Sequence, residues 1–253
     1  PKTLAQKANR NDEVGRLVSA FNSAIRRLNE NEVTRKQLIS DISHELRTPL
    51  TNISGRIEAF DDGLINDCRG LVKFTAQQIT GLIDIVDDMD VLVAIDSGEF
   101  SLNRSGVEIV AFLDDLLSIH SVNSGYTWAI NGPATVVQID RSRFQQIVNN
   151  LLDNALKAKP SGLLININLS ATDTHTVIDF EDNGPGVSED HRPFLFDRLY
   201  RVDDSRNIET GGSGLGLAIV KDIVNAHGGD VSCFVAHCGG LGIKIKLPTS
   251  GGV

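Results

Sequence analysis

The sequence predicts a multidomain protein, a long helical hairpin followed by an α+β domain. Apolar residues repeat every seven positions until Ser97-Gly98 ends the pattern. Beyond that point short strand-like runs alternate with helical ones, and thirteen of the 23 glycines lie from Gly184 onward. Because glycine gathers where the backbone bends or approaches a ligand, this second part is where we expect a binding site. A length of 253 residues also favours two domains over one.

The composition argues against several classes of protein. The 24 Lys and Arg against 33 Asp and Glu give a net charge of −9, whereas nucleic-acid binding depends on a basic face. The three cysteines (Cys68, Cys233 and Cys238) lack metal-binding spacing and predict reduced thiols in a cytosolic setting. No apolar run approaches the roughly 18 residues of a membrane span. The chain begins with Pro rather than Met, so we expect a soluble piece of a longer protein.

The first helix is expected from about Val14 to Ile57. Its core positions form two interleaved heptad series, Val18, Ile25, Ile39, Leu46, Ile53 and Val14, Phe21, Leu28, Ile42. Glu32 and Arg35 interrupt these series. Two interpretations of the interruption fit equally well, a hydrated stretch of coiled coil or a soft joint between two helical modules.

The second helix follows a break at Asp61-Asp62-Gly63. Its heptad runs through Val72, Ile79, Val86 and Val93. Two antiparallel helices with a short loop form a hairpin that still has apolar surface to bury. We therefore expect two chains to pair as a homodimer through a four-helix bundle.

The remaining chain predicts helices lying on one face of a mixed sheet. Helical runs are expected at Val107–Ile119, Arg141–Ala158 and Gly214–Ala226. Strands are expected at Tyr126–Ile130, Thr135–Ile139, Leu163–Leu169, Thr176–Phe180, Asp230–Val235 and Leu241–Leu247. Adjacent strands with helices between the pairs are typical of an α+β domain.

A histidine stands on the outermost heptad position of the first helix. His44 is expected to face solvent, and Glu45 beside it can orient the ring and raise its basicity. Thr48 lies one turn further on the same face, and Pro49 is expected to bend the helix. An ordinary surface histidine is the alternative interpretation of His44 taken alone.

Three polar or glycine-rich segments in the second part indicate nucleotide chemistry. Asn150, Asn154 and Lys157 share one helix face, where an amide oxygen can ligate Mg²⁺ and a lysine can meet phosphate. In Asp182–Val187, a carboxylate after a strand can accept from an exocyclic amine, and the glycines leave room for a planar ring. Gly211–Leu217 precedes a helix and exposes N–H groups to phosphate, without the spacing of a dinucleotide fingerprint or a P-loop. Each segment alone also fits a polar helix face, a turn or a surface loop.

In this order, the motifs resemble those of the cytoplasmic half of a membrane sensor histidine kinase of two-component systems. The similar segments are Ser43–Leu50 (phosphoacceptor box), Asn150–Lys157 (Asn box), Asp182–Val187 (first glycine box), Phe196–Arg201 (Phe box) and Gly212–Leu217 (second glycine box). The stretch Asn11–Asn22 resembles the closing half of a HAMP signalling module.

The resemblance implies a dimeric helical hairpin joined to a Bergerat-type α/β sandwich that binds ATP. The implied boundaries are 1–32 for the end of the HAMP module and signalling helix, 33–97 for the dimerisation and histidine phosphotransfer hairpin, and 101–250 for the catalytic ATP-binding domain. The resemblance further implies that this is the cytoplasmic portion of a protein anchored upstream in the inner (cell) membrane.

The resemblance also implies roles for individual residues. His44 is the residue phosphorylated by ATP, Glu45 its acid–base helper, and Thr48 places a water for dephosphorylation. Asn154 ligates Mg²⁺, and Asp182 reads the adenine amine. The other implied nucleotide-binding residues are Asn150, Lys157, Gly184, Gly186, Phe196, Arg198, Tyr200, Arg201, Gly212, Gly214, Leu215, Gly216 and Leu217. Ala158 departs from the family, where an aromatic residue or His is common.

The implied function is ATP-dependent autophosphorylation of His44, phosphotransfer to an aspartate of a response regulator, and phosphatase activity toward that regulator. One alternative is a nucleotide-binding signalling scaffold, a pseudokinase that transfers no phosphate. A second is an ATP-gated clamp of the same fold, similar to DNA gyrase. The histidine block argues against a clamp, which has no use for an exposed histidine beside an acid on a bundle helix.

Overall fold

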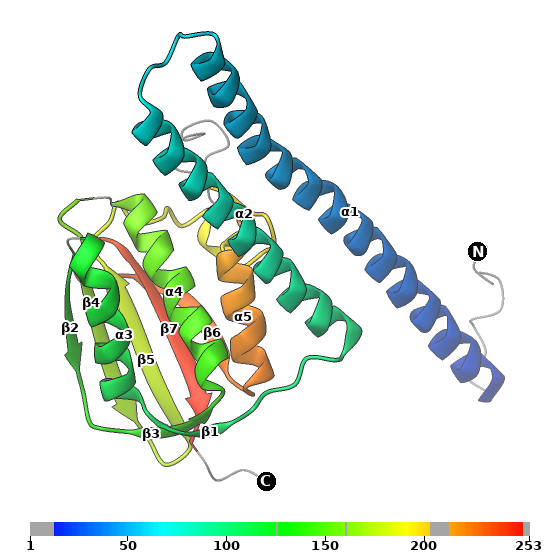
Figure 1. Cartoon of the computed structure of the whole chain (residues 1–253). Helices are drawn as coiled ribbons and strands as arrows, with labels where there is room; N and C mark the ends of the chain where they lie inside the picture. The colour runs from blue at the N-terminus through cyan, green and yellow to red at the C-terminus, as the bar shows by residue number, and fades with distance from the viewer. Residues whose placement is uncertain (1–12, 125, 160, 203–212, 250–253) are drawn as a thin grey trace. The chain divides into compact units, whose positions relative to one another are not determined.

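The computed structural model describes residues 13–124, 126–159, 161–202 and 213–249, although many side chains of the first helix up to His44 and the last few of the third helix lie outside the description (Figure 1). The chain divides into two compact units, Pro1–Ile85 and Val86–Val253. No helix among the described residues is both long and apolar enough to cross a membrane.

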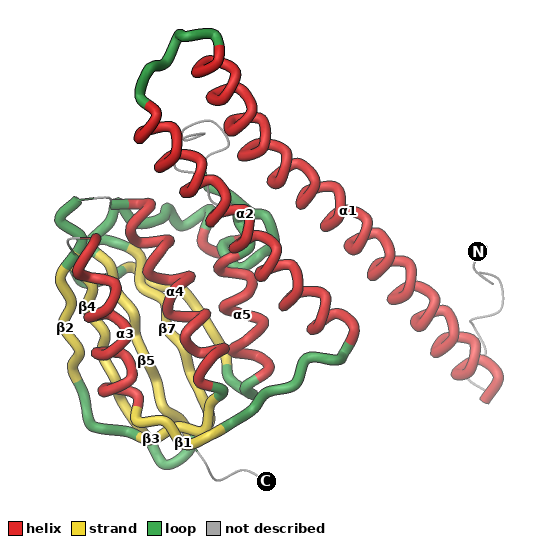
Figure 2. Tube along the Cα trace, viewed as in Figure 1, coloured by secondary structure: helices red, strands yellow, loops and turns green. Residues whose placement is uncertain are grey.

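Two long helices and a loop make up the N-terminal part of the chain (Figure 2). Helix α1 spans Glu13–Asp61 and continues through Pro49, and α2 spans Cys68–Ser97. Gly63 follows α1 with φ 72°, a conformation that glycine adopts without steric cost, so the predicted break is confirmed. The guanidinium of Arg56 on α1 lies 4.4 Å from the ring centre of Phe74 on α2.

A five-stranded mixed sheet forms the core of the second unit. Its order is β2-β4-β5-β7-β6, where β2 (Thr127–Asn131) runs parallel to β4 (Leu164–Ala171). The other pairs are antiparallel and join β5 (His175–Asp182), β7 (Leu241–Pro248) and β6 (Asp230–Val235). Helices α3 (Ile109–Ser124), α4 (Arg141–Ala158) and α5 (Gly216–Ala226) cover one face, as Figure 1 shows. The predicted α+β arrangement is confirmed.

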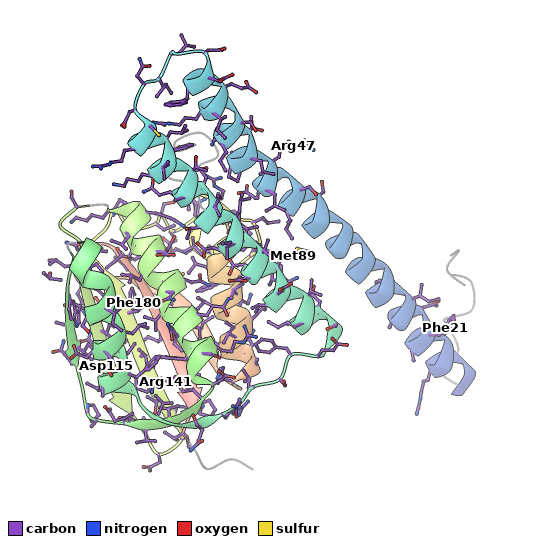
Figure 3. The ribbon with its side chains drawn as sticks, viewed as in Figure 1. Phe21, Arg47, Met89, Asp115, Arg141 and Phe180 are labelled. Atoms are coloured by element: carbon purple, nitrogen blue, oxygen red, sulfur yellow. The ribbon has the colours of Figure 1, made fainter. Side chains whose placement is uncertain are left out.

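Side chains from the covered face of the sheet and from the helices form the core (Figure 3). Phe180 on β5 and Phe144 on α4 are almost fully buried, and alternate residues along β4 and β5 point into this layer. The opposite face of the sheet carries mostly polar side chains.

The start of α3 differs from the prediction of a helix from Val107. Ser105–Glu108 instead forms strand β1, which pairs antiparallel with β3 (Val136–Ile139). The Glu108 carboxylate accepts the N–H groups of Val110 and Ala111 at 3.1 and 2.7 Å, so it caps the helix and α3 begins at Ile109. A short 3₁₀ helix, η1 (Arg192–Phe194), was also not predicted.

The two helices that carry the Asn box and the second glycine box are joined by Asp140 and His227. The Asp140 carboxylate caps α4 by accepting from the N–H groups of Ser142 and Arg143. The backbone N–H of Asp140 donates to Nε2 of His227 at 3.0 Å. Nδ1 of His227 donates to the carbonyl of Ile223 on α5 at 2.8 Å. Burial lowers the pKa of His227, which is therefore a neutral structural histidine.

Candidate functional site

The first element of the site is a buried carboxylate at the end of β5. Oδ1 of Asp182 accepts the N–H groups of Gly184 at 2.7 Å and of Leu241 at 3.2 Å. Oδ2 has no hydrogen-bond donor among the described residues. One oxygen is therefore fixed by the backbone, and the other is available to accept a hydrogen bond from a ligand.

The glycines that follow Asp182 pack too closely on their neighbours to carry side chains. A Cβ on Gly184 would lie 2.8 Å from Oδ1 of Asp182, and one on Gly186 (φ +70°) would lie 2.9 Å from the carbonyl oxygen of Gly239. Ala158 at the end of α4 borders the same space, since its Cβ is 3.6 Å from the Cβ position of Gly184. The small Ala158 side chain therefore lies directly against the first glycine box.

The Asn box and the second glycine box meet at Asn150. Its Nδ2 donates to the carbonyl of Gly216 at 3.3 Å, and a Cβ on Gly216 would lie 3.5 Å from Cγ of Asn150. Asn154 and Lys157 follow one and two turns further along α4 and are exposed. The structure thus brings the start of α5 and the polar face of α4 together.

The second glycine box has a tight approach at its start. Gly214 has φ +67° and faces Leu199, itself at φ 65°, whose N–H donates to the carbonyl of Gly214 at 2.9 Å. A Cβ on Gly214 would lie 2.9 Å from Cα of Leu199, so only glycine fits. The Leu215 side chain is fully buried, which leaves only its backbone for a nucleotide, and Leu217 is half-buried. Gly212 lies outside the described residues.

The Phe box residues contact other protein groups. The Arg198 guanidinium forms a bidentate ion pair with Asp96 at 2.9 Å and reaches Asp222 on α5 at 3.1 Å. The Tyr200 hydroxyl lies 2.6 Å from Nδ1 of His191. Arg198 and Tyr200 are therefore engaged with other residues of the second unit, and their contacts with a nucleotide remain predictions. Phe196 is half-buried and Arg201 is exposed, and their contacts with a nucleotide also remain predictions.

The proposed phosphoacceptor block lies in the second half of α1. His44 is a helical residue whose side chain lies outside the description. Glu45 is half-buried, and Thr48 is exposed on the same helix. Their catalytic roles remain predictions.

Several residues that shape the site were not found from the sequence. Asp140 could have been recognised, because an aspartate directly before a helical pattern is a common N-cap signal. Glu181 contacts His237, which lies 56 positions away in the sequence. Asp140 contacts His227, which lies 87 positions away. No local sequence pattern connects the members of either pair.

Comparisons with known proteins agree with this division of the chain. The family model "His Kinase A (phospho-acceptor) domain" matches residues 34–98, and "Histidine kinase-, DNA gyrase B-, and HSP90-like ATPase" matches residues 139–251. The signal transduction histidine-protein kinase BaeS of Escherichia coli (strain K12) is 35% identical over 241 residues, which cover 94% of this chain and 52% of BaeS. The chain therefore spans about half the length of that relative.

Two solved structures have the same fold. The Acinetobacter baumannii histidine kinase AdeS superimposes with a TM-score of 0.68 at 25% identity, covering 82% of this chain and 98% of that one. The histidine kinase ThkA, solved in complex with response regulator protein TrrA, gives a TM-score of 0.67 at 19% identity, covering 94% and 68%. With the phosphoacceptor model over its helical part and the ATPase model over its α+β part, the chain belongs to the sensor histidine kinases of two-component systems.

Proposed function

We propose that this chain uses ATP to phosphorylate His44, passes the phosphoryl group to an aspartate of a response regulator and dephosphorylates that regulator. The observation that carries the proposal is the set of polar and glycine residues that the second unit brings together. Oδ2 of Asp182 has no donor among the described residues and lies beside the closely packed Gly184, while Asn150 lies against the second glycine box.

The residues of the site fit different parts of the nucleotide. Oδ2 of Asp182 accepts the exocyclic amine of adenine, and Gly184 and Gly186 admit the ring. Lys157 meets phosphate charge, and the backbone N–H groups at the start of α5 add further donors. The outward position of Asn154 and Lys157 on α4 supports this assignment.

Asn154 fits Mg²⁺ by the chemistry of its side chain. Its amide oxygen is exposed, and Mg²⁺ prefers oxygen ligands, taking one or two from the protein and others from phosphate and water. When bound, the ion neutralises charge on the phosphates of ATP. Asn154 would hold it, with Asn150 beside it on the same helix face.

The phosphoacceptor residues perform the transfer. A ring nitrogen of His44 attacks the γ-phosphorus, the bond to the bridging oxygen of ADP breaks, and the Glu45 carboxylate takes the imidazole proton. Thr48 positions the water that hydrolyses the aspartyl phosphate of the regulator. The match of residues 34–98 to the phosphoacceptor family supports the first role.

The chain is proposed to act as a homodimer and as the cytoplasmic portion of a membrane-anchored receptor. Exposed apolar residues on α1 and α2 support the dimer. The similarity of Asn11–Asn22 to a HAMP module supports a membrane anchor upstream, and Asn11 and Asp12 lie outside the described residues.

Labelling with γ-³²P-ATP and Mg²⁺ tests the proposal. The wild-type chain is expected to gain acid-labile, base-stable label, and His44→Ala to gain none, because no acceptor nitrogen remains. His175→Ala, which changes the first residue of β5 in the second unit, is the matched control and keeps its label. Label that persists in His44→Ala would contradict the proposed acceptor. ATP hydrolysis without labelled protein indicates an ATP-gated clamp. Nucleotide binding without either hydrolysis or labelled protein indicates a pseudokinase.

A further inference from the structure

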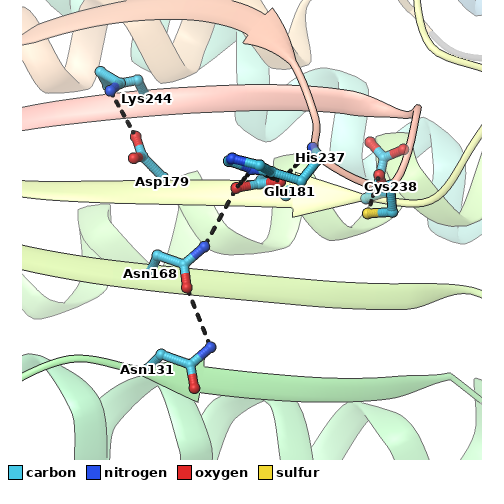
Figure 4. Close-up of polar contacts among 8 residues, drawn as sticks. Asn131, Asn168, Asp179, Glu181, His237, Cys238 and Lys244 are labelled. Carbon is cyan, nitrogen blue, oxygen red and sulfur yellow. Dashed lines mark hydrogen bonds and ion pairs between the residues drawn. The ribbon is translucent and has the colours of Figure 1, made fainter.

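A ladder of polar side chains crosses the face of the sheet opposite α3, α4 and α5 (Figure 4). Asn131 on β2 donates to Asn168 on β4 at 3.1 Å, and Asn168 donates to Glu181 on β5 at 3.3 Å. The ladder ends at His237, in the turn between β6 and β7. Glu181 is only 3% exposed, although it lies on this face.

Glu181 holds both the backbone and the side chain of His237. The N–H of His237 donates to Oε2 at 2.8 Å, and Nδ1 lies 3.0 Å from both carboxylate oxygens. Burial raises the pKa of Glu181, but the hydrogen bonds from His237 and Asn168 together lower it by more. The net pKa therefore lies below its usual value, and the carboxylate is ionised at neutral pH. Hydrogen bonds to a buried carboxylate are among the stronger ones in proteins.

The turn that carries His237 is also a wall of the base site. Leu241, directly after the turn, supplies one of the two N–H groups that fix Oδ1 of Asp182. Gly240 packs so closely on Asp182 that a Cβ would clash with the Asp182 carbonyl oxygen, and the carbonyl of Gly239 faces Gly186. A shift of this turn therefore moves the Leu241 N–H that donates to Asp182 and the Gly239 carbonyl that packs against Gly186.

We propose that Glu181 and His237 are positioning residues for base recognition, which hold the β6–β7 turn so that Asp182 keeps its adenine-reading oxygen in place. The proposal rests on the proposed function of Asp182. Without the His237 side chain the turn loosens, Leu241 N–H leaves Oδ1, and the carboxylate rotates. Adenine then loses a preorganised acceptor, whereas guanine, which presents an acceptor oxygen at the same place, loses nothing.

The test measures autophosphorylation of the full chain with ATP and its competition by GTP. For His237→Ala, the KM for ATP is expected to rise about 5- to 10-fold, as the loss of one typical hydrogen bond implies, because the His237 side chain is 89% exposed and the backbone bond to Glu181 remains. The kcat stays within about twofold of wild type because the phosphate-binding residues are unchanged. The preference for ATP over GTP falls by the same factor as the affinity for ATP.

Rescue and control variants separate positioning from general stability. His237→Asn places an amide donor close to the position of Nδ1, so it is expected to restore the KM, and Glu181→Gln to raise it. His175→Ala, at the opposite end of β5, leaves the KM unchanged. An unchanged KM and unchanged base preference in His237→Ala would overturn the proposal, as would equal losses for both nucleotides. Asp182→Asn tests the underlying site separately: if it binds ATP normally, base recognition lies elsewhere and the proposed role of Asp182 fails.

Discussion

Under the proposed function, Asp182 becomes selective because two backbone donors already occupy one of its two carboxylate oxygens. Two backbone donors from separate segments, Gly184 and Leu241, converge on Oδ1. The carboxylate is buried, so a polar ligand that meets Oδ2 does so with little competition from water. Glycine is needed at position 184, since a Cβ there would lie 2.8 Å from Oδ1 and disturb the carboxylate.

A buried histidine predicts how stability depends on pH. Burial lowers the pKa of His227 in the folded protein, whereas a histidine in the unfolded chain has a pKa of about 6.5. The unfolded state therefore binds more protons, so the stabilisation is full above about pH 6.5 and is lost as pH falls from there toward the lowered native pKa. We expect the free energy of unfolding, followed by fluorescence of the only tryptophan, Trp128, to fall as the pH drops below about 6.5.

His227→Gln isolates this contribution. The variant loses the buried contacts of the imidazole and is therefore less stable than wild type at high pH. Because the amide does not titrate, only wild type loses stability as the pH falls, and the difference in unfolding free energy narrows. The half-exposed His175 lies outside this contact between α4 and α5, and His175→Ala should retain the wild-type slope. A constant difference between wild type and His227→Gln across this range would contradict the assignment of a neutral, buried histidine.

The residues that sequence could identify are those whose signal is local. Asp182 and its glycines stand within five positions of one another, and Asn150, Asn154 and Lys157 share a helical period. Glu181 gives no such signal, because its proposed role depends on contact with His237. That residue lies 56 positions later in the sequence, and only the fold brings it next to Glu181. Long-range contacts of this kind are decided by strand order, which periodicity does not specify.

At the scale of elements, the same distinction explains which boundaries were predicted correctly. Helix α4 spans Arg141–Ala158 as expected, because its apolar period and its capping aspartate lie in one continuous segment. The expected helix from Val107 was wrong, since β1 exists only through pairing with β3 about 30 residues later. Glu108 belongs to both elements, as the last residue of the strand and the cap of the helix.

Removing that cap should weaken α3 and the small sheet together. For Glu108→Ala we expect a loss of about 1–3 kcal/mol in unfolding free energy, since the N–H groups of Val110 and Ala111 lose a charged acceptor. Urea titration followed at Trp128, which bonds to Asp114 on α3, measures this loss. Glu99→Ala removes an exposed carboxylate outside any strand or helix and serves as the control. Equal stability of Glu108→Ala and Glu99→Ala would show that the cap contributes nothing.

At the scale of the whole molecule, the single chain leaves its helical surface incomplete. Three apolar residues of α2, Val72, Ile79 and Ile83, are 63%, 47% and 54% exposed, although their helical spacing places them along one stripe. Exposed stripes of this kind mark interfaces in soluble proteins. A second copy would bury them as the core of a four-helix bundle, which turns two marginal hairpins into one stable unit.

This argument predicts that one charge on the stripe separates the dimer. Ile79→Glu would place a carboxylate in the core of the bundle, and an unpaired buried charge costs several kcal/mol per chain. Sedimentation equilibrium at micromolar concentration is expected to give a dimer for wild type and a monomer for Ile79→Glu. Gln77→Glu adds the same charge at an exposed position on the outer side of the heptad and should stay dimeric. If Ile79→Glu also sediments as a dimer, the stripe is not the interface, and the two chains must associate through another surface.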